Sequence, residues 1–98
     1  MTIKDILETL ATATTPVAKV LQKGEQYKII GIGFKKGMLL KEHTTPIVAK
    51  LIVLQGVVKY KEGVEEKILG QYDETPIPIG VLHSVEALED ALCLLVQG

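Results

Sequence analysis

The amino-acid sequence has 98 residues and contains no arginine, no asparagine and no tryptophan. Without guanidinium groups, and with a formal net charge of −1, the chain lacks both the planar donor and the basic excess that nucleic-acid binding uses. The absence of asparagine also excludes N-glycosylation. We therefore expect no nucleic-acid partner.

Cysteine is equally scarce, because it occurs once, at Cys93. A disulfide framework needs pairs of cysteines, unless Cys93 bridges two chains, and a cysteine-rich zinc site needs several thiolates. No apolar run approaches the roughly 20 residues that cross a bilayer, and residues 1–5 lack the features of a signal peptide. These observations predict a cytoplasmic protein with no membrane partner.

Apolar residues, in contrast, are plentiful. They make up 47% of the chain, and the mean hydropathy is +0.28. A domain of this size buries only roughly 60–65% of the surface of its unfolded chain. We therefore expect part of the apolar surface to lie in a subunit interface, and a homodimer is the simplest assembly that provides one.

The pattern near the N-terminus predicts one short helix over the first ten residues. Thr2 is a capping residue, Asp5 follows three positions later, and apolar residues recur at helical spacing. Residues 11–16 are small and polar and end at Pro16, which is typical of a connector. We therefore assign residues 1–16 to a helix and connector. Residues 17–98, whose pattern is described next, are assigned to a β-barrel, and the two parts form a single domain spanning 1–98.

From residue 17 onward, short apolar runs alternate with turn signals. Strands are expected at residues 17–22, 27–33, 38–43, 49–55, 57–61, 65–69, 81–86 and 91–97, and residues 72–78 are expected to form a turn. Such spacing without intervening helices favours an all-β sandwich or barrel. The runs at 51–54 and 94–96 are apolar on both faces, so the outer face is expected to be covered by the helix or by a second subunit.

His43 and His83 are the two histidines of the chain. Each stands at the end of a predicted strand, and imidazole is the side chain that titrates near neutral pH and ligates metals well. Around them the sequence resembles the cupin family, a double-sheet jelly-roll barrel (double-stranded β-helix) that includes the RmlC-like proteins. The matching positions of its two motifs are Gly37, His43, Gly56, Pro78, Gly80 and His83.

The departures from the motifs concern the metal ligands that the resemblance implies. Thr45 stands where the family's second histidine would be, and Ala49 stands at its glutamate position. The second motif has Ala87 in place of asparagine. Two imidazoles alone leave a divalent cation mostly water-coordinated, because catalytic sites usually supply three protein ligands.

We therefore predict a small-molecule-binding protein whose pocket lies inside the barrel and lacks a full metal site. Its expected ligand-binding residues are His43, Thr45, Leu51, Val53, Val81 and His83. Alternation from His43 would turn Leu39, Lys41 and Thr45 toward the pocket and Glu42 away from it.

Two alternatives remain open. A metal-dependent enzyme of the isomerase or oxygenase type would bind zinc, iron, manganese or nickel through His43 and His83, with Asp73 or Glu74 as the nearest loop carboxylates. A structural or partner-binding module would use the apolar outer strand faces. Whether the protein is an enzyme is left open by the sequence. Cys93 is expected to be a buried thiol, and Ser84 to face away from His83, which disfavours a serine–histidine pair.

Overall fold

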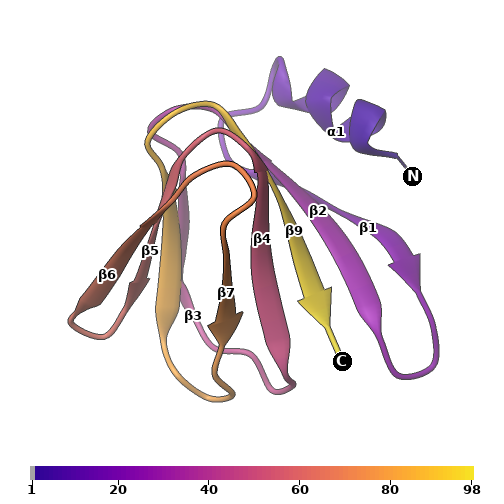
Figure 1. The fold of residues 1–98 in the computed structure, drawn as a ribbon. Helices are drawn as coiled ribbons and strands as arrows, with labels where there is room; N and C mark the ends of the chain where they lie inside the picture. The colour runs from indigo at the N-terminus through magenta and orange to yellow at the C-terminus, as the bar shows by residue number, and fades with distance from the viewer. Residues whose placement is uncertain (1) are drawn as a thin grey trace.

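The computed structural model describes residues 2–98, which form one helix and nine strands (Figure 1). In chain order these are α1 (Ile3–Leu10), β1 (Val17–Lys23), β2 (Lys28–Phe34), β3 (Leu39–His43), β4 (Ala49–Gln55), β5 (Val58–Glu62), β6 (Glu65–Leu69), β7 (Glu74–Ile77), β8 (His83–Ala87) and β9 (Ala91–Gln97). Among these residues, no helix is long and apolar enough to span a bilayer.

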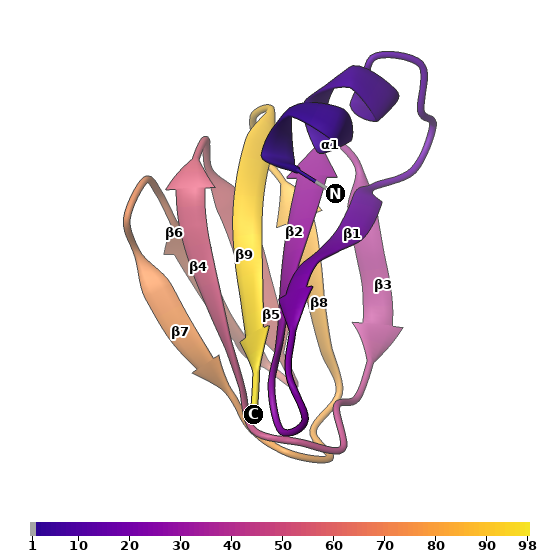
Figure 2. The same cartoon turned by 90° about the vertical axis from the view of Figure 1, so that its right-hand side faces the viewer.

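The strands form two antiparallel sheets. The five-stranded sheet has the order β1-β2-β9-β4-β7, and the four-stranded sheet has the order β3-β8-β5-β6. Figure 2 shows the two sheets as successive layers, with α1 lying over the upper part of the five-stranded sheet. This arrangement confirms the predicted two-layer, all-β fold with a short N-terminal helix.

The main hydrophobic core lies between the two sheets. Alternate residues of each strand point inward, so that β4 contributes Ala49, Leu51 and Val53, whereas β5 contributes Val58 and Tyr60. Further buried members of this core are Ile32, Phe34, Leu69, Ile77, Val85, Ala87, Ala91 and Cys93. The inner faces are therefore well packed over most of their length.

The N-terminal helix begins with the predicted cap. The Thr2 side chain accepts a hydrogen bond from the Asp5 backbone N–H at 3.2 Å, and the Asp5 carboxylate accepts one from the Thr2 N–H at 3.1 Å. Ile6 and Leu10 are buried against Val17 and Leu92 on the outer face of the five-stranded sheet. The helix thus covers part of that face, as the sequence predicts when it offers either the helix or a second subunit as the cover.

Gly31 and Gly33 make this close approach possible. A Cβ atom at Gly31 would lie 2.6 Å from Cδ1 of Ile6, and one at Gly33 would lie 2.8 Å from Cγ2 of Ile6. Real Cβ atoms do not show such short contacts, so a side chain at either position would force Ile6 to shift from its place on the sheet. The Gly-x-Gly pattern on β2 therefore serves helix packing.

The structure corrects one predicted element, because residues 74–77 form β7 and not part of a turn. The prolines at 76 and 78 made this segment resemble a connection. β7 pairs only with β4 and lies at the edge of its sheet, with Pro76 opposite Lys50. An edge strand accommodates proline because its missing N–H needs no partner on the open side.

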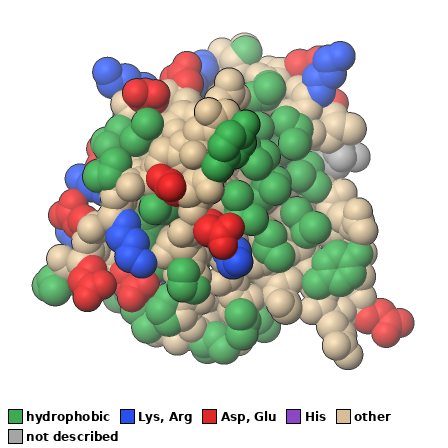
Figure 3. All heavy atoms as spheres, viewed as in Figure 1, with side chains coloured by type: hydrophobic (Ala, Val, Ile, Leu, Met, Phe, Trp, Pro, Cys, Tyr) green, Lys and Arg blue, Asp and Glu red, His purple; other side chains and the backbone are tan. Residues whose placement is uncertain are grey.

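The outer face of the five-stranded sheet remains apolar beyond the helix. In Figure 3, hydrophobic side chains gather on the side of the molecule where β4, β9 and β2 lie in Figure 1. Outward-facing residues here include Ile52, Leu94 and Val96, which are half-buried in the single chain. Ile52 and Val96 also line a hollow of about 430 Å³ with the exposed Val48.

Candidate functional site

The two histidines lie side by side at one end of the barrel. His43 at the end of β3 pairs directly with His83 at the start of β8, and directly paired residues of antiparallel strands face the same side of the sheet. Their ring centroids are 4.2 Å apart, with an interplanar angle of 56°. The His83 residue is only 3% exposed, whereas His43 is half-buried.

Both imidazole rings are oriented by a carbonyl of their own strand. Nδ1 of His43 lies 2.8 Å from the Lys41 carbonyl oxygen, and Nδ1 of His83 lies 3.1 Å from the Val81 carbonyl oxygen. Because a carbonyl accepts only, each Nδ1 carries the hydrogen. When the rings are neutral, each Nε2 therefore presents a lone pair.

Nε2 of His83 is the ring nitrogen that the strand carbonyl does not engage. No residue in the range 2–98 hydrogen-bonds to it. The same residues contain no fully buried side-chain nitrogen or oxygen that lacks a partner. Nε2 of His83 therefore keeps some contact with solvent and has no partner in the described part of the chain.

Tyr60 and Glu62 on β5 flank the histidine pair. The Tyr60 ring stacks on His83 with a centroid distance of 5.9 Å and an interplanar angle of 28°. Its hydroxyl donates a hydrogen bond of 2.9 Å to the Glu62 carboxylate. Burial, followed by this contact with Glu62, raises the pKa of Tyr60 far above its ordinary value, so the phenol stays protonated.

The surroundings of His83 favour its neutral form. Burial is the largest influence and lowers its pKa below 6.5, and the neighbouring His43 lowers it further. The Val81 carbonyl and the Glu62 carboxylate act in the opposite direction without reversing the outcome. At neutral pH, His83 is therefore a hydrogen-bond acceptor at Nε2.

Tyr60 and Glu62 are further site residues, and the sequence contains no local signal that indicates them. Both stand on a strand that ends at a recognised turn, but their proximity to the histidines arises because β5 pairs with β8. In that pairing Glu62 lies opposite His83 and Tyr60 lies opposite Val85. These residues are more than 20 positions apart in sequence, so no local pattern indicates the contact.

A register shift in β3 changes which residues accompany His43. The pairing of β3 with β8 is irregular between Leu40 and His43, as in a β-bulge. As a result, Leu39 lies opposite Glu86, and both Leu39 and Lys41 line a hollow on the outer face of the sheet. The expectation that Leu39 and Lys41 share the inner face with His43 is therefore wrong, whereas Glu42 does face outward.

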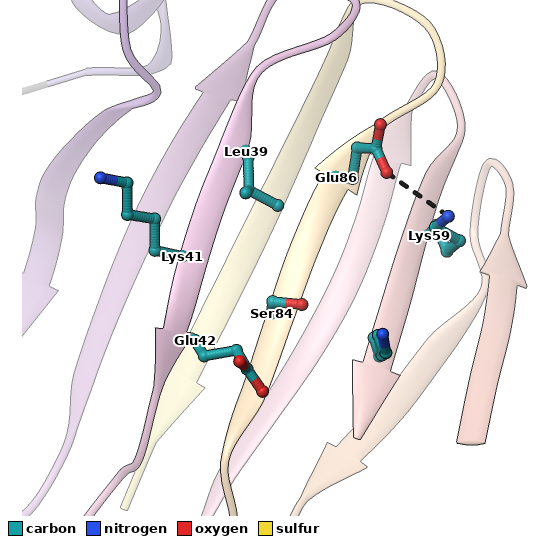
Figure 4. Close-up of a pocket in the computed structure, with 7 residues that line it drawn as sticks. Leu39, Lys41, Glu42, Lys59, Ser84 and Glu86 are labelled. Carbon is teal, nitrogen blue, oxygen red and sulfur yellow. Dashed lines mark ion pairs between the residues drawn. The ribbon is translucent and has the colours of Figure 1, made fainter. Parts of the chain in front are cut away.

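That outer hollow has a volume of about 420 Å³ and is shown in Figure 4. Ser84 opens into it, which confirms that this hydroxyl faces away from His83. A 3.4 Å ion pair joins Lys59 to Glu86 across the hollow. The charged groups on its walls are of both signs and are exposed or half-buried, as on an ordinary solvated strand face.

The other predicted ligand-binding residues are dispersed. Thr45 is buried, and its hydroxyl donates to the Ile47 carbonyl oxygen at 3.1 Å. Leu51 and Val53 belong to the packed core, and Val81 is 37% exposed just before β8. The structure therefore brings together the two histidines. Of the predicted apolar ligand-binding residues, Leu51 and Val53 lie in the core and Val81 lies outside it.

The two loop carboxylates proposed as metal ligands are engaged elsewhere. Asp73 accepts a hydrogen bond of 2.8 Å from the Gly70 N–H, which closes the turn between β6 and β7. Glu74 forms a 2.9 Å ion pair with Lys50 on the outer face of the five-stranded sheet. The contacts of both carboxylates are therefore with Gly70 and Lys50 and not with the histidines.

The donor set does not fit the metal site that the cupin motifs imply. In the described part of the chain, no three His, Cys, Asp or Glu side chains are placed to hold one ion. Two imidazoles would leave most of the coordination sphere to water. The geometry therefore suits hydrogen bonding by the two imidazoles better than metal binding.

Comparison of the sequence with models of known families and with curated proteins gives no match. The structure, however, is similar to that of an RmlC-like cupin protein from Desulfovibrio desulfuricans, with a TM-score of 0.79 and 23% identity over 86% of this chain and 82% of that chain.

Two further solved structures are equally similar. A cupin superfamily protein from Desulfitobacterium hafniense has a TM-score of 0.80 and 15% identity, covering 86% of this chain and 77% of that one. An RmlC-like cupin from Shewanella frigidimarina has a TM-score of 0.80 and 16% identity, covering 88% and 78%. Together with the two-sheet topology, these likenesses show that the chain has the cupin fold.

Proposed function

We propose that this protein binds a small molecule at the histidine end of the barrel, without a full metal site. The observation that carries the proposal is the histidine pair, whose rings are 4.2 Å apart and are each held by a strand carbonyl through Nδ1. This arrangement leaves two Nε2 atoms with fixed orientation. Fixed polar groups at the edge of an apolar core are typical of small-molecule sites.

The packing of the barrel supports a site at this end only. Leu51, Val53 and Tyr60 are 2% exposed or less and fill the space between the sheets. His83 is the buried polar side chain beside this core, and its Nε2 has no partner among residues 2–98. A ligand would therefore lie over the imidazoles and rest on the core beneath them.

The test is a screen of small neutral, acidic and basic molecules by thermal shift, followed by NMR of the two imidazoles. Because the chain has only two histidines, their ring signals are simple to assign. A ligand that raises the melting temperature should perturb both rings, and His43→Gln should weaken its binding. The matched control is Glu42→Gln, the neighbouring residue that faces outward.

The proposal fails if no compound in the screen binds, or if every compound that binds leaves both imidazole signals unchanged. Equal affinity in His43→Gln, Glu42→Gln and the unaltered protein would contradict it as well.

The homodimer expected from the apolar content is compatible with this site, because the histidines do not lie on the apolar face of the five-stranded sheet.

Metal content decides the enzyme alternative separately. We expect protein purified without a histidine tag to contain zinc, iron, manganese and nickel far below one equivalent, because two imidazoles supply too few ligands. Elemental analysis by mass spectrometry measures this. A stoichiometric metal that disappears in His83→Gln would favour the reduced two-histidine enzyme over a metal-free site.

A further inference from the structure

A row of acceptor groups crosses the four-stranded sheet beside the histidines. His43 pairs with His83, His83 pairs with Glu62, and Glu62 pairs with Glu65. Direct partners in antiparallel strands face the same side, so all four side chains belong to the face turned toward the five-stranded sheet. We call these four residues the acceptor row.

The acceptor row carries negative charge that the protein does not neutralise. No ion pair within residues 2–98 involves Glu62 or Glu65. The lysine nearest to them on this face, Lys67, lies opposite Tyr60 and donates its ammonium hydrogen to the Thr75 hydroxyl at 3.1 Å. Lys41 and Lys61 line the hollow on the opposite face of the sheet.

Hydrogen-bond donors are equally scarce along the row. The Tyr60 hydroxyl already donates to Glu62, and both Nδ1–H groups already donate to strand carbonyls. The free atoms are carboxylate oxygens and two Nε2 lone pairs. One of these lone pairs belongs to His83. This residue is only 3% exposed, and its Nε2 has no partner among the described residues.

The spacing of these groups distinguishes possible ligands. Neighbouring strands are roughly 4.8 Å apart, so the acceptors from His43 to Glu62 extend over roughly 10 Å. A metal ion needs its ligand atoms about 2 Å from a single point, and the described residues contain no such group of three. An elongated molecule with a donor at each end matches the row better.

We propose that the acceptor row binds a small aliphatic amine, such as a diamine, with its ammonium group against Glu62 and a second donor against the histidine Nε2 atoms. This inference rests on the proposed function, because it names the ligand class of the same site. It also predicts discrimination against carboxylates and phosphates, which would meet like charge at Glu62 and find no free donor.

A series of four-carbon molecules tests the charge preference at constant length. The probes are 1,4-diaminobutane, 4-aminobutan-1-ol, butane-1,4-diol and succinate, each titrated into the full chain and followed by NMR of the imidazoles and the backbone. We expect affinity to fall in that order. Diamine binding should also weaken as salt is raised, because the carboxylates are partly exposed and are screened.

Glu62→Gln removes the charge and keeps an oxygen that accepts from Tyr60, so the variant should fold. We expect it to weaken diamine binding by about tenfold or more, the factor associated with one charge-assisted hydrogen bond, and to leave diol binding nearly unchanged. Glu42→Gln, which removes a carboxylate on the outer face, should leave diamine affinity unchanged.

Three outcomes would overturn the inference. Succinate or the diol could bind the histidines as tightly as the diamine, which would leave the proposed site intact but refute its charge preference. Glu62→Gln and Glu42→Gln could have equal effects. In the third outcome, all four probes leave the imidazole signals unchanged, whereas another compound of the wider screen perturbs them. That result would refute the ligand class and keep the proposed site.

Zinc chloride provides a further arm of the same titration. Binding of Zn²⁺ that depends on both histidines, but is unaffected by Glu62→Gln, would show that the imidazoles act as a metal site and would contradict the amine assignment. Zn²⁺ binding much weaker than diamine binding would support it, since a single ion cannot engage acceptors spread over several strands.

Discussion

At the scale of single residues, the most informative group is His83, a nearly buried imidazole with one ring nitrogen tied to a carbonyl. Its burial predicts acid sensitivity of the fold. The folded-state pKa lies below the ordinary 6.5, so below that pH the unfolded chain binds more protons than the folded chain. The stability contributed by neutral His83 is present above the ordinary pKa and is lost as pH falls through the folded-state pKa.

We therefore expect the free energy of unfolding to decrease as pH is lowered from about 7.5 to about 5, a range that includes the ordinary histidine pKa. Urea denaturation at several pH values measures this decrease. The decrease should be smaller in His83→Gln, which cannot acquire the charge. An identical pH profile in His83→Gln and the unaltered protein would contradict the expectation.

Cys93 gives a second prediction at this scale. The thiol is fully buried in the main core on β9, and burial raises its pKa to about 12. Because the thiolate is the reactive form, the native protein should react very slowly with Ellman's reagent. The reaction should become fast in denaturing urea. Rapid reaction of native protein at neutral pH would show that the core around β9 opens readily.

At the scale of elements, α1 is held to the five-stranded sheet by few side chains. Ile6 is fully buried against Gly31 and Gly33, whereas its neighbour Leu7 is 45% exposed. Ile6→Ala should therefore lower the free energy of unfolding by about 2–4 kcal/mol, as for other buried aliphatic truncations. Leu7→Ala, the matched control, should cost less than about 1 kcal/mol.

Chemical denaturation of both variants checks this prediction. A similar cost for the two truncations would mean that α1 does not depend on Ile6. If Ile6→Ala instead unfolds the helix alone, the loss should appear as a separate early transition by circular dichroism. Either result would change the interpretation of the cluster that contains Ile6, Leu10, Val17 and Leu92.

The elements also show which structural features the sequence could predict. The helix cap and most strands were recognisable because capping residues, glycines and hydrophobic alternation act over a few positions. β7 was missed because Pro76 and Pro78 are rare in strands and the edge position that tolerates Pro76 depends on sheet order. The bulge in β3 was missed because a register shift leaves no local signal, and this placed Leu39 and Lys41 on the wrong face.

The candidate site was predictable only in part for the same reason. The resemblance to the cupin motifs points to His43 and His83 and implies that the other motif ligands are replaced. Tyr60, Glu62 and Glu65 join the histidines through pairing of β5 with β8 and β6. Such lateral neighbours are set by topology, so they require the folded sheet to be known.

At the scale of the whole molecule, the apolar outer face of the five-stranded sheet extends beyond the part that α1 covers, through Ile52, Leu94 and Val96. We propose that it forms the interface of a homodimer, as the apolar content of the sequence predicts. Ile52→Glu on this face should convert the dimer to a monomer, as measured by light scattering coupled to size-exclusion chromatography. Ile68→Glu serves as control, because Ile68 is exposed on the outer face of the other sheet.

A monomer at all accessible concentrations would refute this assembly. A dimer that persists in Ile52→Glu would place the interface elsewhere on the molecule. A stable oligomer that binds no compound of the screen would favour the alternative in which the protein is a structural or partner-binding module.

The anchoring of each imidazole by the carbonyl two residues before it has a consequence for how this barrel can change over evolutionary time. Lys41 and Val81 contribute only backbone atoms to these contacts, so their side chains are free to vary. The carboxylates, in contrast, flank the tight turn between β5 and β6. Substitutions at Glu62 or Glu65 would therefore change the charge beside the imidazoles without removing the carbonyl contacts that orient the two rings.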